Sequence, residues 1–211
     1  MASRAAAGLP DRDDHRASPG WSRRNRFAGK PRAQEDLAVE VRPARIEDAA
    51  RIAEIHVLGW QGGYRGLMPH DYLDGLAPAN RLSRRIQSLR DADWSRGGCL
   101  VVADDEGMLA GFADIGQSRD DDAESGTVGE VIAIYLAPDS WGKGLGRELM
   151  AAALTNLARL DYDEVTLWVL DTNVRARRFY EAAGFGPDGA VKVDDSIGFP
   201  LREARYRRSL G

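Results

Sequence analysis

Residues 141–160 read "WGKGLGRELMAAALTNLARL", in which three glycines within five residues come directly before a helical pattern. Gly142, Gly144 and Gly146 allow the backbone to approach a large ligand closely, and they leave several amide N–H groups without an intrachain acceptor. The helix dipole adds about half a positive charge at the same end of the helix. This stretch therefore predicts an anion cradle, and a phosphate group is the usual occupant of such a cradle.

Two common phosphate-binding motifs do not fit this stretch. The nucleoside-triphosphate loop requires Gly-Lys followed by Ser or Thr, but Lys143 is followed by Gly144, and no hydroxyl is placed to hold magnesium. The dinucleotide motif requires a glycine where Arg147 stands, and it belongs after a first strand, whereas this loop follows the fourth predicted strand. Neither of these two nucleotide sites is predicted.

The strand "VIAIYLAP" (131–138), the glycine loop and the helix after it resemble the GNAT (GCN5-related N-acetyltransferase) superfamily. Gly144 and Gly146 match the two small residues of its diphosphate signature, and Trp141 stands where the signature has Gln or Arg. A glycine-rich loop without a ligand is the alternative interpretation, but a second block argues against it. This block, "LWVLDTNVRARRFYEAAGFGP" (167–187), resembles the next signature of the superfamily through Asn173, Ala176, Tyr180, Gly184 and Phe185. The resemblance extends over residues 39–210.

The resemblance implies acetyl-coenzyme A (acetyl-CoA) as co-substrate. Its diphosphate would bind the amides of the glycine loop, and its peptide-like pantetheine arm would pair with an exposed strand edge. Asn173 would hold the arm or a nearby backbone group. The implied cofactor-binding residues are Ile134, Tyr135, Leu136, Trp141, Gly142, Lys143, Gly144, Leu145, Gly146, Arg147, Asn173 and Tyr180.

Acetyl transfer requires a neutral amine, and a lysine amine with a pKa of about 10.4 is almost wholly protonated at pH 7, a handicap of roughly 4–5 kcal/mol. A general base therefore matters. The resemblance places Glu130 where the histone-acetyltransferase branch keeps its base, and Tyr180 beside the thioester sulfur as the acid that protonates the leaving thiolate. The alternatives are a solvent-exposed glutamate at a strand end and a helix tyrosine packed under the sheet.

His56, Trp60 and Tyr64 are the predicted substrate-binding residues, because they belong to a stretch that resembles acceptor-side helices of a bacterial subgroup. An ordinary hydrophobic core explains His56 and Trp60 equally well. The acceptor is a small-molecule amine or a protein amine. The formal net charge of −4 mildly favours a cationic small molecule.

The order of predicted elements indicates an α/β (α+β) fold of the GNAT type. Helical spacing predicts helices over 45–59, after Pro69, over 78–92, from 147 and from 173, and a hairpin turn is predicted at 105–107. Strands follow one another early and alternate with helices late, which predicts a mixed central sheet of six to seven strands flanked by helices. The resemblance implies a splay between the fourth and fifth strands. Residues 1–36 are predicted to be a disordered tail, and residues 37–211 an acetyltransferase domain.

Composition narrows the remaining function classes. A net charge of −4 gives no electrostatic reason to expect nucleic acid or an anionic membrane, and no apolar run reaches the about 20 residues of a membrane helix. A single cysteine, Cys99, excludes an internal disulfide, and three scattered histidines argue against a metal site. We expect a cytoplasmic enzyme that needs no metal, with a homodimer allowed by the resemblance.

The predicted function is an N-acetyltransferase that moves the acetyl group of acetyl-CoA to a primary amine by direct attack. Cys99 lies in a strand that does not suit a covalent intermediate. Two alternatives stay open, namely an N-acyltransferase for longer acyl-CoA donors and a non-catalytic module that senses CoA.

Overall fold

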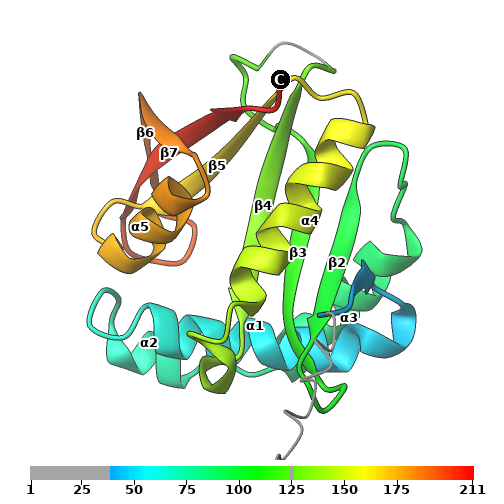
Figure 1. The fold of residues 1–211 in the computed structure, drawn as a ribbon. Coiled ribbons are helices and arrows are strands. Elements are labelled where there is room, and N and C mark those ends of the chain that lie inside the picture. The colour runs from blue at the N-terminus through cyan, green and yellow to red at the C-terminus, as the bar shows by residue number, and fades with distance from the viewer. Residues whose placement is uncertain (1–38, 124–125) are drawn as a thin grey trace, which may run out of the picture. The chain divides into compact units, whose positions relative to one another are not determined.

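The computed structural model describes residues 39–123 and 126–211, and the predicted tail at residues 1–36 lies outside these described residues. Within them the chain forms a seven-stranded sheet in the order β1-β2-β3-β4-β5-β7-β6 (Figure 1). Neighbouring strands are antiparallel except β4 and β5, which are parallel. The mixed sheet predicted from sequence is confirmed. Its strands are β1 (Val41–Pro43), β2 (Gly98–Ala103), β3 (Leu109–Gln117), β4 (Val128–Leu136), β5 (Glu164–Leu170), β6 (Gly186–Asp194) and β7 (Leu201–Ser209).

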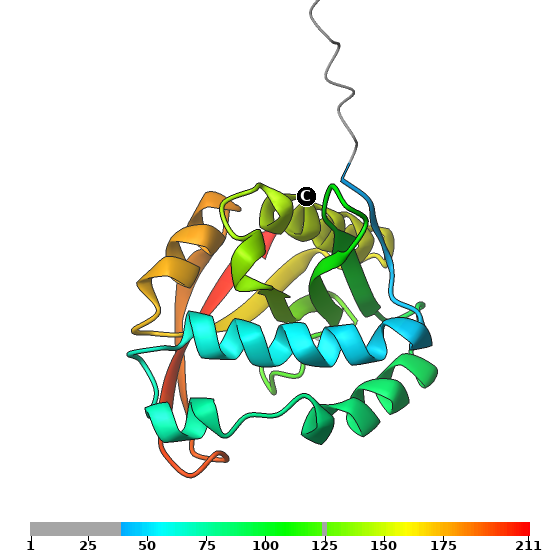
Figure 2. The same ribbon diagram turned by 90° about the horizontal axis from the view of Figure 1, so that it is seen from below.

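Helices cover both faces of this sheet (Figures 1 and 2). Alternate residues of β2 belong to two different cores: Leu100 and Val102 pack with α4, whereas Cys99 and Val101 pack with α1. This alternation is the period-two pattern of a strand buried on both faces. The helices are η1 (Ile46–Asp48), α1 (Ala49–Gly63), α2 (His70–Asp74), α3 (Ala79–Arg90), η2 (Pro138–Ser140), α4 (Leu145–Arg159) and α5 (Val174–Ala182).

The fourth and fifth strands separate after a short parallel ladder. β4 pairs with β5 only through Val128, Gly129 and Glu130, whereas the whole of β5 pairs with β7. The β3–β4 ladder also shifts its register between Asp114 and Ile115, which leaves Ile132 of β4 outside the regular pairing. Such a bulge bends a strand and increases its twist. The predicted splay is confirmed, and it opens the sheet edge on which the site is built.

Two helices differ in detail from the sequence prediction. α1 does not end at Gly59 but continues to Gly63. Gly59 is a packing position rather than a helix end: it is buried, and a Cβ at this residue would approach the ring of Tyr135 to 3.0 Å. α3 was identified by its apolar spacing, yet the residue of α3 that is buried is Arg85. Its guanidinium donates to both carboxylate oxygens of Asp114 on β3, at 2.7 and 3.0 Å, which allows the charge to be buried.

Candidate active site

The glycine loop between η2 and α4 presents a row of unpaired amides. Gly142 and Gly144 have φ angles of 77° and 85°, the left-handed region that glycine adopts at little cost. Gly144 is the N-cap of α4, and it supplies no side chain to cap the helix. Within 39–123 and 126–211, the backbone N–H groups of residues 142–146 donate to no protein acceptor. The amide of Arg147 donates to Gly144 at 2.9 Å, so the cradle ends one residue earlier than the sequence predicted.

These amides border a cavity of about 380 Å³, which we call the glycine-loop cavity. Its walls come from α1, β4, the loop itself, β5 and α5. Two predicted cofactor-binding residues stand apart: Lys143 is exposed and does not line the cavity, and the side chain of Leu145 is buried in the core beneath α4. The other predicted cofactor-binding residues line it together, namely Ile134, Tyr135, Leu136, Trp141, Gly142, Gly144, Gly146, Arg147, Asn173 and Tyr180.

One wall of the cavity is the edge of β4 that the splay leaves unpaired. Beyond Glu130 this strand has no partner on the β5 side, so a peptide-like ligand can take the place of the missing strand. Trp141 already uses part of this edge, because its indole Nε1–H donates to the Leu136 carbonyl at 3.1 Å. Trp141 therefore anchors the glycine loop to the end of β4.

Arg175 is a cavity residue that the sequence analysis missed. It lies in the first turn of α5, and its guanidinium carbon stacks 3.6 Å from the ring centroid of Trp141. Arg175 lines the same cavity. It therefore brings a cation from α5 to the side of Trp141, the position at which the family signature has Gln or Arg. The sequence offered one signal: a basic residue in a helix that begins with Asn173.

Asn173 and Tyr180 both belong to α5. The Asn173 side chain accepts a hydrogen bond from the Ala176 amide at 3.1 Å and caps the helix, so its carboxamide holds a nearby backbone group. Tyr180 lies two turns later and borders the cavity. Burial, followed by the field of Tyr64, raises the pKa of the Tyr180 hydroxyl above its usual value, which keeps the hydroxyl protonated as a proton donor must be.

Three tyrosines meet at the α1 side of the cavity. The hydroxyls of Tyr64 and Tyr135 lie 3.4 Å apart. Tyr180 is close enough to contribute to the raised pKa of Tyr135, and Tyr64 contributes to the raised pKa of Tyr180. Tyr64 was predicted as a substrate residue, and the structure places it in the glycine-loop cavity. Burial raises the pKa of Tyr64 and of Tyr135. Sequence alone did not bring these residues together, because they come from α1, β4 and α5.

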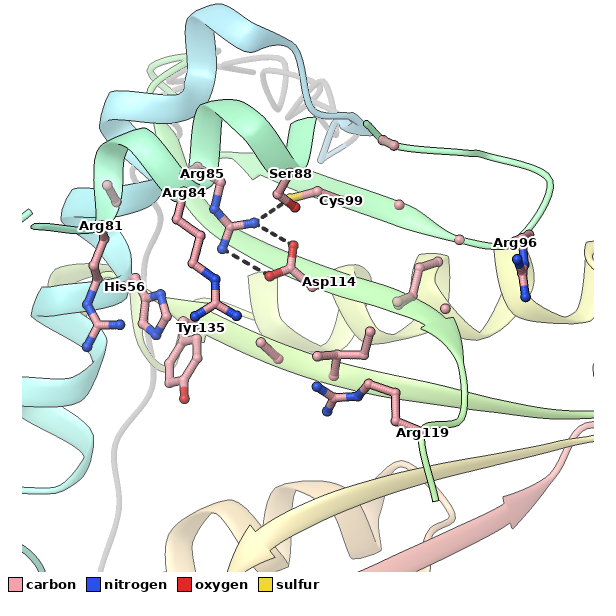
Figure 3. Close-up of a pocket in the computed structure, with 18 of the residues that line it drawn as sticks. His56, Arg81, Arg84, Arg85, Ser88, Arg96, Cys99, Asp114, Arg119 and Tyr135 are labelled. Atoms are coloured by element: carbon pink, nitrogen blue, oxygen red, sulfur yellow. Dashed lines mark hydrogen bonds and ion pairs between the residues drawn. The ribbon is translucent and has the colours of Figure 1, made fainter. Parts of the chain in front are cut away.

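A second cavity of about 720 Å³ lies between α1, α3 and strands β2 to β4 (Figure 3). We call it the arginine pocket, after Arg81, Arg84, Arg85, Arg96 and Arg119 in its walls. The predicted substrate residues His56 and Trp60 line it. Ile132, Ala133 and Tyr135 line both cavities, so the two meet across the bulged part of β4. The two cavities therefore border the same stretch of β4.

His56 is held as a neutral imidazole in this pocket. Its ring stacks on Tyr135 with centroids 4.9 Å apart. Burial, followed by the positive charges of Arg81, Arg85 and Arg84, lowers the pKa of His56 from 6.5 to about 3. A base this weak does not take a proton from an ammonium group near pH 7, so His56 lines the pocket without serving as the general base.

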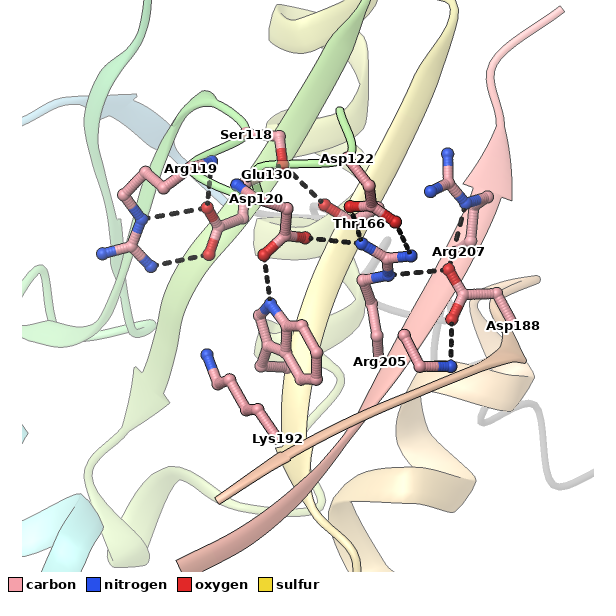
Figure 4. A network of polar contacts seen from close by, with 12 residues as sticks. Ser118, Arg119, Asp120, Asp122, Glu130, Thr166, Asp188, Lys192, Arg205 and Arg207 are labelled. Atoms are coloured by element: carbon pink, nitrogen blue, oxygen red, sulfur yellow. Dashed lines mark hydrogen bonds and ion pairs between the residues drawn. The ribbon is translucent and has the colours of Figure 1, made fainter. Parts of the chain in front are cut away.

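Glu130, the predicted base, is buried at the point where β4 and β5 separate. Its side chain is 2% exposed, which excludes the alternative of a solvent-exposed strand end. Arg119 donates to Oε1 at 2.6 Å and to Oε2 at 3.0 Å, and its amide donates to Oε2 at 3.2 Å (Figure 4). Because Arg119 is 64% exposed, one partner of this pair faces water. Glu130 itself is not in the wall of either cavity.

A neighbouring polar network fixes the loop that carries Arg119. Arg205 of β7 pairs with Asp120, Asp122 and Asp188, and the Trp168 indole donates to Asp120 at 2.9 Å (Figure 4). Arg205 is 7% exposed at its side chain, so its charge is buried among these carboxylates. The loop after β3 is thereby tied to β5, β6 and β7.

Three further sequence expectations concern reactive groups and membranes. Cys99 is buried, and burial raises the pKa of its thiol, which removes the thiolate a nucleophile needs. No cluster of His, Cys, Asp and Glu that could hold a metal ion occurs among the residues the structure describes. In that same part of the chain no helix combines the length and apolar character needed to cross a membrane.

Comparison with known proteins identifies relatives of this chain. Residues 69–185 match the model of the acetyltransferase (GNAT) family. The N-acetyltransferase YuaI of Bacillus subtilis is 33% identical over 168 residues, which cover 78% of this chain and 90% of that protein. A mycothiol acetyltransferase of Propionibacterium freudenreichii is 32% identical over 117 residues, which cover 54% of this chain and 35% of that protein.

Solved structures share the fold at lower identity. PaiA N-acetyltransferase from Thermoplasma acidophilum, in complex with coenzyme A, superposes with a TM-score of 0.60 at 20% identity, covering 82% of this chain and 99% of that one. A phosphinothricin acetyltransferase from Sinorhizobium meliloti, in complex with acetyl-CoA, gives a TM-score of 0.63 at 21% identity, covering 83% and 90%. At these identities the likeness establishes the fold.

Proposed function

We propose that the acceptor is a primary amine which attacks the thioester directly. The premise is that this chain belongs to the acetyltransferase (GNAT) family and transfers an acetyl group from acetyl-CoA. In this step the amine nitrogen forms a bond to the acetyl carbonyl carbon, and the bond from that carbon to sulfur breaks. The nitrogen loses a proton to a base, and the leaving thiolate of CoA gains a proton from an acid. Residues 37–211 form the domain that carries this reaction.

The observation that carries the proposal is the row of free amides at residues 142–146 beside the unpaired edge of β4. Charged hydrogen bonds from such amides to a diphosphate, together with the α4 dipole, suit the anionic part of CoA. The strand edge suits its pantetheine arm. Both features line one cavity, in the order in which a CoA molecule presents its diphosphate and its arm.

Tyr180 is the proposed acid. It borders the cavity from α5, and its hydroxyl stays protonated because burial raises its pKa. A neutral phenol can protonate a thiolate, since the ordinary pKa values of the two groups, about 10 and 8.5, lie close together.

Glu130 is the proposed base. Its burial at the splay supports this role, and Arg119 occupies both its oxygens. The role therefore requires Arg119 to shift when substrate binds. Arg119 is largely exposed, so its guanidinium can move into water. Glu130 would then be a buried carboxylate without its partner, a state that is costly and that favours taking up a proton.

The tyrosine cluster supports acetyl as the group transferred. Tyr64, Tyr135 and Tyr180 bring three aromatic rings to the wall of the glycine-loop cavity, and we propose that they limit the length of the acyl chain. A panel of acyl-CoA donors of increasing length, followed by release of the CoA thiol, tests this. Turnover that rises with chain length would replace acetyl-CoA by a longer donor.

The proposal is tested by calorimetric titration of the purified protein with CoA and with pantetheine, which lacks the diphosphate. We expect CoA to bind at least about tenfold more tightly, because several charge-assisted hydrogen bonds are each worth about 1.5–3 kcal/mol. Equal affinity for the two ligands would contradict the proposed cradle. Binding of CoA without release of its thiol in the presence of any amine would instead indicate the sensing module. Assembly as a homodimer and a cytoplasmic location remain part of the proposal and do not affect this test.

A further inference from the structure

The arginine pocket has an excess of positive charge that the protein leaves uncompensated. Its walls hold the five arginines named above and two aspartates, Asp93 and Asp114. Asp114 neutralises Arg85, and Arg119 is paired with Glu130. Arg81 and Arg84 have no carboxylate within ion-pair distance among residues 39–123 and 126–211. Two unpaired cations one helical turn apart repel each other, and this cost is relieved when an anion binds between them.

The two free guanidinium groups extend into the same space. Figure 3 shows Arg81 and Arg84 reaching from α3 toward the part of the pocket lined by His56 and Tyr135, with Arg119 entering from the opposite side. The Arg81 guanidinium carbon lies 5.3 Å from the Trp60 ring centroid, so this side chain is held against an aromatic face. The field of these arginines also contributes to the lowered pKa of His56.

The Trp60 indole in the same wall does not add a donor for the ligand. Its buried Nε1–H makes no well-formed hydrogen bond within the described ranges, but it lies near enough to the Tyr135 hydroxyl to lower the pKa of Tyr135. The two free guanidinium groups of Arg81 and Arg84 are the groups that suit an oxyanion.

The charge of the pocket argues against the expectation drawn from composition. The net charge of the whole chain is −4, which mildly favoured a cationic acceptor. In the pocket wall the acidic residues are Asp93 and Asp114, against five arginines, and Asp114 is paired with Arg85. A pocket responds to its local field, and the local field here is positive.

We propose that the acceptor is a small amine that carries an oxyanion, such as a carboxylate or a phosphonate, and that Arg81 and Arg84 hold this oxyanion. The amine of the same molecule then lies toward Tyr135, Ala133 and Ile132, where the pocket meets the glycine-loop cavity. The inference rests on the proposed function, because it assigns the arginine pocket to the acceptor.

The test compares matched amines in the acetyl-CoA assay. One series contains free α-amino acids and aminoalkyl phosphonates, and the other contains the amides and methyl esters of the same compounds, which lack the charge. We expect the best substrates to come from the charged series, with kcat/KM at least about tenfold above their uncharged counterparts. An uncharged series that is acetylated as well as, or better than, the charged one would overturn the proposal.

Variants of the two arginines identify the site. Arg81→Gln and Arg84→Gln should each raise KM for charged acceptors about tenfold, with little change for uncharged ones. Arg90→Gln is the matched control, because Arg90 lies on the same helix outside the pocket. Equal losses for both series would mean that the arginines serve the stability of α3 and would contradict the proposal.

A binding measurement separates this inference from the proposed function. The chain has three histidines, so the ring resonances of His56 can be assigned by NMR through substitution. Titration with succinate should shift the His56 resonances in the unmodified protein and shift them less in Arg84→Gln. Absence of any shift, with CoA still binding in calorimetry, would overturn the oxyanion site and leave the proposed function standing. Loss of CoA binding would overturn the proposed function instead.

Discussion

The two cavities that meet at β4 recognise their ligands by different means. The glycine-loop cavity offers backbone amides and a strand edge, which depend on the local conformation of a few consecutive residues. The arginine pocket offers side chains from α1, α3, β2, β3 and β4, which only folding brings together. A backbone site leaves a motif in the sequence, whereas a side-chain site assembled from distant elements leaves scattered residues. The first serves a co-substrate common to a family, and the second can vary between its members.

The largest effect is expected in the glycine-loop cavity, at Tyr180. Tyr180→Phe removes the proposed proton donor and should lower kcat about 10²-fold or more, while CoA binding stays unchanged. Steady-state kinetics and calorimetry check the two parts. Tyr162→Phe is the control, because its hydroxyl donates to the Arg96 carbonyl away from the glycine-loop cavity. An unchanged kcat in Tyr180→Phe would remove Tyr180 as the acid.

Glu130→Gln tests the proposed base. We expect kcat/KM at pH 7 to fall about 10²-fold and the acidic limb of the pH–rate profile to disappear, because the amide cannot accept the proton. Glu164→Gln provides the comparison, since Glu164 also pairs with an arginine but is partly exposed, whereas Glu130 is buried where β4 and β5 separate. A variant with an unchanged profile and a lower midpoint of urea unfolding would show that Glu130 only holds Arg119.

The arginine pocket should also make the fold sensitive to acid through His56. The pKa of His56 is about 3 in the folded state, below the 6.5 of the unfolded chain, so the unfolded state binds the proton first as pH falls. Stability is therefore lost from about pH 6.5 downward, by about 1.4 kcal/mol per pH unit until pH approaches 3.

Urea unfolding of His56→Asn at pH 7.5 and 4.5 measures this effect. The variant should lose about 2–3 kcal/mol less than the unmodified protein between the two pH values. His70→Asn, at the exposed start of α2, is the control. If both variants show the pH dependence of the unmodified protein, His56 is not held neutral by its pocket.

On the backbone side of the comparison, Gly142→Ala should weaken CoA binding about tenfold. An alanine at φ 77° is strained and should distort the row of amides. Gly107→Ala, in the turn between β2 and β3, is the control. Gly107 has a φ of 80°, and a Cβ would meet open space at Gly107 as it would at Gly142, so the control has the same backbone strain away from the site. Calorimetry with CoA should separate the two variants. Equal affinities would mean that the loop amides do not hold the diphosphate.

The smallest effect is expected at Arg175, which adds positive charge to the backbone site from α5. Arg175→Gln should weaken CoA binding about fivefold and leave pantetheine binding unchanged, because only CoA carries the diphosphate. Arg178→Gln, an exposed position on the same helix, is the control. A loss of pantetheine affinity of the same size would indicate that Arg175 shapes the cavity rather than binding phosphate.

By itself the sequence determined the mixed sheet, the positions of its helices and the glycine loop at the start of α4. These features follow from short-range patterns, because alternation, helical spacing and glycine conformation act over a few residues. The splay after the fourth strand came from the family resemblance, and the cap that Asn173 provides to α5 was seen only in the structure.

Only the tertiary structure decided what these elements bring together. It placed Arg175 of α5 on Trp141 of the loop, Tyr64 of α1 against Tyr135 of β4, and Arg119 across Glu130. It also collected arginines into one pocket of a chain whose net charge is negative. Charge and aromatic contacts act through space between residues far apart in the chain, so their partners cannot be identified until the fold fixes the distances.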